Sequence, residues 1–213
     1  MGFPSLIIDN FFDDPDKIVD IANTLEYTPD ADGRWPGKRS SLLHEINPEL
    51  FKYICNKIYF IFYPNGVEYY KMQMSFQHIE PYSFNNTGWI HQDNSQFGGI
   101  IYLTKDPQAV TGTSLYEPTR EWCIPSLNNI DAKNDKHLGK KIDKDDYNRV
   151  KKLYDDSFNE TVRVENIYNR LFLFDGKAWH GVPNFGTKPR LTIVFFGRGT
   201  TDHFREPLSR GVG

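Results

Sequence analysis

The chain has 213 residues, of which 38% are hydrophobic, with 25 Lys and Arg against 28 Asp and Glu. This length fits one domain with a sizeable core, and the near balance of charge gives no signal for nucleic acid or membrane binding. No basic and apolar leader and no 18-residue apolar run occurs, so we expect a cytoplasmic protein without a membrane span. Two cysteines, Cys55 and Cys123, fit a reducing compartment, with a single disulfide as the alternative.

Residues 1–69 are predicted to form an α/β buttress that starts with a strand over Ser5–Asp9. Asp14 and Asn47 each precede a proline, and an Asx residue before a proline is a typical start of a helix. Apolar residues then recur at helical spacing, which predicts two helices packed on one face of a sheet. The first set is Ile18, Ile21, Ala22 and Leu25, and the second is Leu50, Phe51, Ile54 and Ile58.

The segment Arg34-Trp35-Pro36-Gly37-Lys38-Arg39 is the most basic local stretch of the chain. An aromatic ring flanked by cations could contact an anionic or peptide substrate. An ordinary surface loop is the alternative interpretation.

From Tyr70 the apolar period becomes two, which predicts a long strand. One face carries Tyr70, Met72, Met74, Phe76 and His78, and the other carries Lys71, Gln73, Ser75 and Gln77. The Met and aromatic face is the expected core face. His78 continues that face, so we interpret it as a structural or second-layer histidine and not as a metal ligand.

His91, Asp93 and His180 are the candidate metal ligands. On a strand, residues i and i+2 share a face, so His91 and Asp93 could reach one ion. The buried strand predicted over 170–176 leads into His180, which must come from a different strand. Two imidazoles and one carboxylate suit octahedral iron(II) and leave three positions open. Each residue alone would be ordinary, and only the joint order is specific.

Arg190 lies ten residues after His180, at the start of a predicted strand over 190–197. Arg190, Thr192 and Val194 share one face of that strand. A buried guanidinium needs a partner, and the carboxylate of a ligand bound beside the metal would provide one.

Together these residues resemble the iron(II)/2-oxoglutarate-dependent dioxygenases, and among them the prolyl-4-hydroxylase-like branch, over about residues 70–198. The resemblance implies a mainly β fold with flanking α-helices and a double-stranded β-helix core of the jelly-roll, cupin-like kind. It places second and third core strands at 98–106 and 111–115. It also implies that Arg190 binds 2-oxoglutarate, and it adds three residues to the expected cosubstrate site: Tyr82, Tyr102 and Thr192.

The segment 117–165 interrupts the resemblance, so residues 1–213 are expected to form one oxygenase domain with an insert in its core, 70–198. Asn128–Lys141 is polar and predicts a mobile loop. A short helix is expected over Asp143–Leu153, with Tyr147, Val150 and Leu153 at helical spacing, followed by a strand over Thr161–Val164. We expect the insert to overhang the mouth of the pocket.

The implied activity is an iron(II)-, 2-oxoglutarate- and O2-dependent hydroxylation of a C–H bond, with succinate and CO2 as coproducts. The branch favours a peptidyl residue such as proline as substrate. A free amino acid or small metabolite is one alternative, and a cupin-like metal-binding protein without 2-oxoglutarate turnover, or an inactive binding module, is another. The sequence gives neither the substrate nor the oligomeric state.

Overall fold

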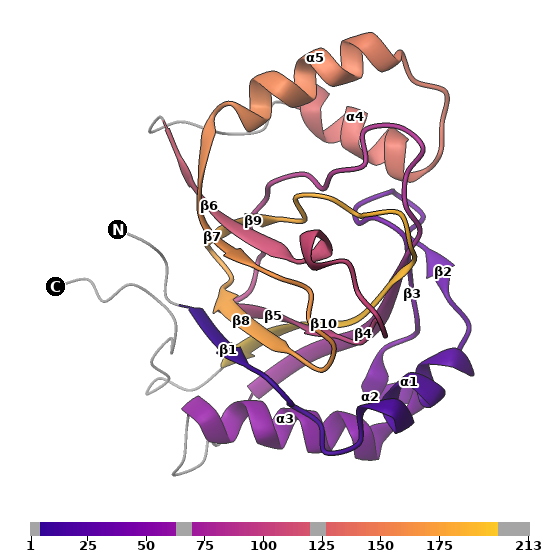
Figure 1. The fold of residues 1–213 in the computed structure, drawn as a ribbon, viewed down its shortest axis with the longest axis vertical. Coiled ribbons are helices and arrows are strands. Elements are labelled where there is room, and N and C mark those ends of the chain that lie inside the picture. The colour runs from indigo at the N-terminus through magenta and orange to yellow at the C-terminus, as the bar shows by residue number, and fades with distance from the viewer. Residues whose placement is uncertain (1–4, 63–69, 120–126, 200–213) are drawn as a thin grey trace, which may run out of the picture.

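In the computed structural model, residues 5–62, 70–119 and 127–199 are described, and their strands form two sheets of antiparallel pairs. The larger sheet has the order β1 (Ser5–Ile8), β8 (Leu171–Asp175), β5 (Phe97–Tyr102), β10 (Arg190–Gly199), β4 (Tyr70–Ile79), β3 (Lys38–Arg39) and β2 (Thr28–Pro29). The smaller sheet consists of β7 (Phe158–Val164), β6 (Thr113–Pro118) and β9 (Trp179–Gly181). The two sheets form the predicted double-stranded β-helix, which is thereby confirmed (Figure 1).

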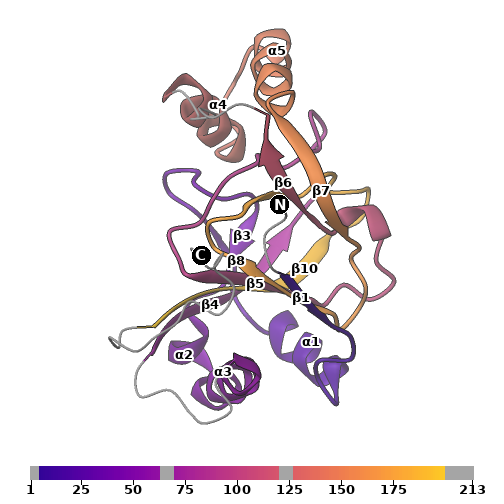
Figure 2. The same cartoon turned by 90° about the vertical axis from the view of Figure 1, so that its left-hand side faces the viewer.

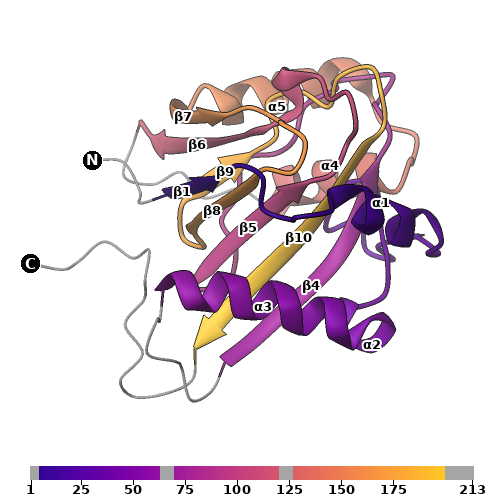
Figure 3. The ribbon, with the colours of Figure 1, turned by 60° about the horizontal axis from the view of Figure 1, so that its bottom comes forward.

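Three helices cover the outer face of the larger sheet: α1 (Pro15–Asn23), α2 (Leu43–Ile46) and α3 (Pro48–Phe62). Figure 3 shows α3 lying across β10 and β4. The predicted caps are present, because Asp14 accepts from the Lys17 N–H at 3.1 Å and Asn47 accepts from the Leu50 N–H at 3.0 Å. Both predicted apolar stripes pack in the core between these helices and the sheet.

Strand β4 divides its residues between two environments, as its alternation predicts. Met72, Met74 and Phe76 face the helices and belong to the main core. His78 lies on that side near the sheet edge, with its Nδ1 3.7 Å from Glu80 and its ring 6.0 Å from that of Tyr27. It therefore lies apart from the candidate metal ligands, on the face turned away from the space between the sheets.

A second apolar cluster fills the space between the sheets, where the barrel closes. Its buried members come from both sheets and are Ile100, Tyr102, Leu115, Val164, Phe172, Phe174, Ala178 and Val194. The strands predicted around 98–106, 111–115, 170–176 and 190–197 are all present, with somewhat different ends. β5 and β8 are buried along their whole length, which explains why they lack polar alternation.

The insert contains two helices, α4 (Leu127–His137) and α5 (Lys144–Asp155), at the opposite end of the molecule from α1–α3 (Figures 1 and 2). The expectation of a loop over Asn128–Lys141 was wrong for its first part, which is helical. Polar contacts to the 33–34 loop hold α4, since Lys133 Nζ donates to the Arg34 carbonyl at 3.1 Å and His137 Nδ1 lies 2.8 Å from the Gly33 carbonyl. Sequence periodicity does not register such contacts.

Helix α5 begins at the predicted cap, Asp143, whose side chain accepts from two backbone N–H groups. Its buried face consists of Tyr147, Lys151 and Tyr154, whereas Leu153 is 61% exposed. The predicted Tyr147, Val150 and Leu153 stripe is thus only partly right. Lys151 can be buried because its Nζ lies 2.5 Å from Asp155.

Two sequence-based expectations concern other parts of the chain. Cys55 is buried in α3, and Cys123 lies outside the described residues. Within the three described ranges, every helix is too short or too polar to cross a lipid bilayer.

Candidate metal centre and cosubstrate pocket

His91 and His180 are brought together by backbone pairing between two distant segments. The His91 N–H donates to the His180 carbonyl at 2.9 Å, and the His180 N–H donates to the His91 carbonyl at 2.8 Å. His180 lies on β9, as expected of a separate strand. The strand expected at 91–93 is only a single bridge residue, because the Asp93 N–H turns away to the Gly176 carbonyl at 2.8 Å.

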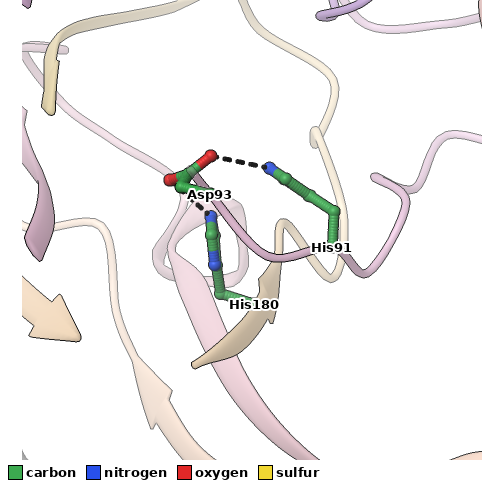
Figure 4. Close-up of side chains that lie close together, drawn as sticks. All are labelled: His91, Asp93 and His180. Carbon is green, nitrogen blue, oxygen red and sulfur yellow. Dashed lines mark ion pairs between the residues drawn. The ribbon is translucent and has the colours of Figure 1, made fainter. Parts of the chain in front are cut away.

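The three predicted ligands nevertheless converge, as Figure 4 shows. One ligand atom from each of His91, Asp93 and His180 lies within 4.8 Å of the others. Asp93 Oδ1 is 3.8 Å from His91 Nε2, and Asp93 Oδ2 is 3.4 Å from His180 Nε2. Among the described residues this is the one group of at least three His, Cys, Asp or Glu side chains close enough to hold an ion.

Backbone carbonyls fix the orientation of both imidazoles. His91 Nδ1 lies 2.9 Å from the Trp89 carbonyl, and His180 Nδ1 lies 2.9 Å from the Ala178 carbonyl. A carbonyl only accepts, so each Nδ1 carries the hydrogen and each neutral ring presents the lone pair of Nε2 to the centre. Carbonyl partners of this kind orient metal-bound histidines and raise their basicity.

The charges of the site fit a cation. Although the His91 side chain is half-exposed, pocket walls surround it, and desolvation together with His180 lowers its pKa to about 4. Burial also acts to lower the pKa of His180, but Asp93 outweighs it and the pKa rises. Asp93 Oδ2 is buried without a hydrogen bond. Two imidazole lone pairs and a carboxylate facing one point repel one another unless a proton or metal ion lies between them.

Arg190 is the largest fully buried side chain among the described residues, 1% exposed, on the inner face of β10. Its Nε donates to the Thr111 carbonyl at 2.9 Å, and its guanidinium lies 5.4 Å from the Tyr102 ring centre. Its Nη2 is buried with no hydrogen-bond partner. Burial is the main cause that lowers the pKa of Arg190, whereas Tyr102 raises it. The guanidinium, which lines the cavity, therefore has an unused donor.

The other three predicted cosubstrate residues occupy different places. Tyr102 is completely buried behind Arg190, and its hydroxyl donates to Thr113 Oγ1 at 2.9 Å. Thr192 is completely buried, and its hydroxyl has no partner. Tyr82 accepts from the Gly37 N–H at 3.3 Å and packs on Phe185. None of the three is among the residues that line the cavity with the candidate metal ligands, and their roles stay predictions.

The cavity that contains His91, Asp93, His180 and Arg190 has a volume of about 220 Å³. Its apolar walls come from the larger sheet, with Ile100, Phe174, Val194 and Phe196, and from Val182, which follows β9. Polar side chains from three other segments complete it, namely Arg34, Trp35, Arg39, Gln77, Lys133 and His137.

The sequence indicated only part of this wall. The basic segment 34–39 was a candidate, and its substrate-contacting interpretation fits its place in the wall. Gln77 was predicted to lie on the face of its strand opposite the Met residues. A polar amide on that face was the only indication in the sequence that Gln77 could line a site. Lys133 and His137 were missed because they lie in the segment interpreted as a loop, and no spacing links them to the site.

The sequence matches the family described as "Family of unknown function (DUF6445)" over residues 2–183. No curated protein matches the sequence significantly.

Several solved structures are similar in fold. HygX from Streptomyces hygroscopicus, with nickel, 2-oxoglutarate and hygromycin B bound, has a TM-score of 0.58 at 13% identity, covering 96% of this chain and 85% of HygX. A prolyl hydroxylase from Trichoplax adhaerens, in complex with a hypoxia inducible factor peptide fragment, has a TM-score of 0.54 at 13% identity, with coverage of 92% and 83%. SnoN, the non-heme alpha-ketoglutarate-dependent epimerase from nogalamycin biosynthesis, has a TM-score of 0.58 at 10% identity, with coverage of 98% and 89%. These likenesses show a shared double-stranded β-helix fold.

Proposed function

The chain belongs to the DUF6445 family, and we propose that it is an iron(II)- and 2-oxoglutarate-dependent oxygenase that hydroxylates a C–H bond. The observation that carries this proposal is one cavity holding both a His-Asp-His cluster and a buried arginine with an unused donor. HygX, SnoN and the prolyl hydroxylase, which share the fold, support the same chemistry.

His91, Asp93 and His180 would hold the iron through two Nε2 atoms and one carboxylate oxygen. Three protein ligands on one face leave three positions for the 2-oxo acid end of the cosubstrate and for O2. When bound, iron(II) supplies the redox chemistry that couples O2 and the oxidative decarboxylation of 2-oxoglutarate to C–H oxidation, with succinate and CO2 as coproducts. The Trp89 and Ala178 carbonyls keep both imidazoles in the tautomer that this binding needs.

Arg190 would bind the distal carboxylate of 2-oxoglutarate through its free Nη2. Thr111 fixes the guanidinium through Nε, so the fork is already oriented when the cosubstrate arrives. Tyr102 packs against the guanidinium, and we propose that it and Thr192 support this carboxylate, Thr192 through its unpartnered hydroxyl. A metal barrel without 2-oxoglutarate would have no use for a buried arginine with an unused donor, so Arg190 favours the oxygenase over the cupin-like alternative.

The apolar walls would exclude water from the reacting groups. Phe174 packs on the His180 ring at 4.5 Å, and Ile100 and Val194 lie beside it in the lining. A low-dielectric wall strengthens the contacts of Arg190 and the carboxylates, and it limits loss of a reactive species to solvent.

The volume of the cavity limits the substrate. At about 220 Å³ it is below the ~300–1,000 Å³ typical of ligand pockets, and the cosubstrate would take up part of it. Only a small moiety can then reach the metal, either a single side chain or a small molecule. Similar folds hold a peptide in one case and hygromycin B in another, so these comparisons do not decide between the expected peptidyl residue and a small molecule.

Formation of succinate tests the proposal. Purified protein with iron(II), 2-oxoglutarate and O2 should convert 2-oxoglutarate to succinate, slowly without substrate and faster with it. The Asp93→Ala protein should not, and Asp106→Ala, which removes an exposed carboxylate, should behave as wild type. Equal succinate formation by the wild type and Asp93→Ala would contradict the assignment.

A further inference from the structure

Arg39 lies in the same row of side chains as the proposed cosubstrate site. In the larger sheet Arg39 of β3 pairs with Gln77 of β4, Gln77 pairs with Thr192 of β10, and Thr192 pairs with Tyr102 of β5. Directly opposed residues point to the same face of a sheet, so this row lies on the face turned toward the smaller sheet, and Arg39 and Gln77 line the cavity there. Two of the arginines that line the cavity, Arg39 and Arg190, therefore lie on strands separated by β4.

Arg39 has no carboxylate partner within the described part of the chain. Aromatic rings surround its guanidinium instead, with Trp35 at 4.3 Å and Phe196 at 5.6 Å from the ring centres. Burial lowers the pKa of Arg39 to about 10, while Asp93 and then Asp30 act to raise it, so it remains a cation at neutral pH. A half-buried guanidinium packed between rings loses part of its hydration, and a bound anion would compensate for that loss.

The two carboxylates near Arg39 already interact with other groups. Asp30 accepts two hydrogen bonds from the Arg34 side chain, at 2.9 and 3.1 Å. Asp93 belongs to the metal cluster. Both act on Arg39 from a distance, and neither forms an ion pair with it.

The wall around Arg39 is rich in unused donors. Arg39 Nε and Trp35 Nε1 are both buried without a hydrogen-bond partner. Lys133 of α4 lines the same cavity, and its ammonium donates one hydrogen bond, to the Arg34 carbonyl at 3.1 Å. An ammonium has three donors, so two remain. A negatively charged acceptor would satisfy these donors together.

We propose that Arg39, Trp35 and Lys133 form the substrate subsite, and that the substrate is a small carboxylic acid such as a free amino or hydroxy acid. The carboxylate accepts from Arg39, Trp35 Nε1 and Lys133, and the remainder of the molecule extends toward the metal. This inference rests on the proposed oxygenase function and replaces the peptidyl substrate favoured by the sequence.

A small acid fits this wall better than a peptide. Arg39, Trp35 and Lys133 are half-buried and line a cavity of about 220 Å³, and hydrogen bonds hold α4 against the 33–34 loop on one side of it. Gln77 fixes the next part of the loop, because its Nε2 donates to the Pro36 carbonyl at 2.9 Å. An extended peptide would need an open groove on both sides of the metal, whereas a free acid needs only the enclosed end.

Benzoate and its neutral isostere benzamide test the subsite directly. Protein is saturated anaerobically with iron(II) and 2-oxoglutarate, and each probe is titrated while tryptophan fluorescence and heat are recorded. We expect benzoate to bind at least about 10-fold more tightly than benzamide, because a charge-assisted hydrogen bond contributes that much to affinity. Arg39→Gln should abolish this preference, and Arg39→Lys should keep part of it.

Lys38→Gln is the matched control, because Lys38 is the exposed neighbour of Arg39 on β3 and points to the other face. It should leave the preference unchanged. Equal binding of benzoate and benzamide by the wild type, or a preference that survives in Arg39→Gln, would overturn the proposal. A capped acidic peptide that displaces benzoate as well as free amino acids do would overturn the small-acid assignment in favour of a peptide.

The same samples separate this inference from the proposed function. Binding of 2-oxoglutarate to iron is followed by its visible absorption band. If the absorption band is present but benzoate is not preferred, the oxygenase function is supported and the subsite is contradicted. If benzoate is preferred in an Arg39-dependent way but the absorption band is absent, the anion subsite is supported and the oxygenase function is contradicted.

Discussion

Replacing Arg190 by methionine tests whether this arginine binds a ligand or stabilises the fold. Methionine is apolar and flexible enough to fill most of the space that the fully buried side chain leaves. The variant loses the hydrogen bond from Nε to the Thr111 carbonyl and the contact with the Tyr102 ring. It also removes a buried cation whose Nη2 has no partner.

The two effects on stability oppose each other. Loss of the bond to Thr111 costs about 1.5–3 kcal/mol, since the donor is charged. Removal of a buried charge with an unused donor should stabilise the fold by a free energy of the same order, because replacing buried ionic groups by apolar ones of similar size is often neutral or stabilising. We therefore expect the free energy of unfolding of the metal-free protein to change by less than about 1.5 kcal/mol. Affinity for 2-oxoglutarate should fall about 10- to 150-fold, because one charge-assisted contact is lost.

Urea unfolding of the metal-free protein gives the first quantity, and anaerobic titration of 2-oxoglutarate into iron-loaded protein gives the second. Iron affinity should stay within a factor of two or so, because no metal ligand is touched. Arg190→Lys should recover part of the affinity, as an ammonium cannot form the two-pronged contact. A variant that is strongly destabilised yet binds 2-oxoglutarate normally would show that Arg190 is structural and would refute this reasoning.

Three further predictions concern the metal and the insert. Asp93→Ala should lose most bound iron, measured by metal analysis after desalting, and retention of one equivalent at wild-type affinity would exclude Asp93 as a ligand. Iron binding requires a neutral His180, and the pKa of His180 is raised. Iron affinity should therefore fall as the pH decreases through that pKa, beginning above about pH 6.5. An iron affinity that does not change between about pH 8 and about pH 5.5 would argue against His180 as a ligand. Replacing Asn128–Lys141 by a short Gly/Ser link should leave the binding of iron and 2-oxoglutarate unchanged. It should reduce the amount of product formed per succinate, because α4 forms part of the cavity wall. An unchanged ratio of product to succinate would show that α4 is a surface insert without a part in the reaction.

The raised pKa of His180 also has a consequence for the metal-free protein. A group whose pKa is higher in the folded than in the unfolded state adds stability below its unfolded value. The pair of His180 and Asp93 should therefore stabilise the metal-free fold below about pH 6.5, and this contribution should disappear as the pH rises through the folded pKa. Bound iron would replace the proton and remove this dependence.

The parts of the site that sequence reasoning identified correctly depend on short-range patterns. The face shared by Arg190, Thr192 and Val194 follows from strand alternation, and the caps at Asp14 and Asn47 follow from local hydrogen bonding. The three candidate ligands do lie together, although their local structure differs from the one expected. His91 and Asp93 converge through a bridge and a turn, where the expected mechanism was a shared strand face.

The parts that were missed depend on contacts between distant segments. Helix α4 has weak apolar periodicity, and its position follows from hydrogen bonds of Lys133 and His137 to carbonyls about 100 residues earlier. The burial of Lys151 beside Tyr154 follows from its pairing with Asp155. The place of Arg39 in the cavity required the register of β3 on β4, which a two-residue strand does not reveal in a sequence.

The central claim is that one cavity binds iron through His91, Asp93 and His180 and binds 2-oxoglutarate beside it through Arg190. Anaerobic titration of the iron(II) protein with 2-oxoglutarate tests it most directly, because the visible charge-transfer band arises only when the 2-oxo acid chelates the bound metal. The account predicts a band that saturates at one 2-oxoglutarate per iron in the wild type, is absent in Asp93→Ala, and needs about 10- to 150-fold more 2-oxoglutarate in Arg190→Met. Iron-loaded wild-type protein that shows no band at saturating 2-oxoglutarate would contradict it.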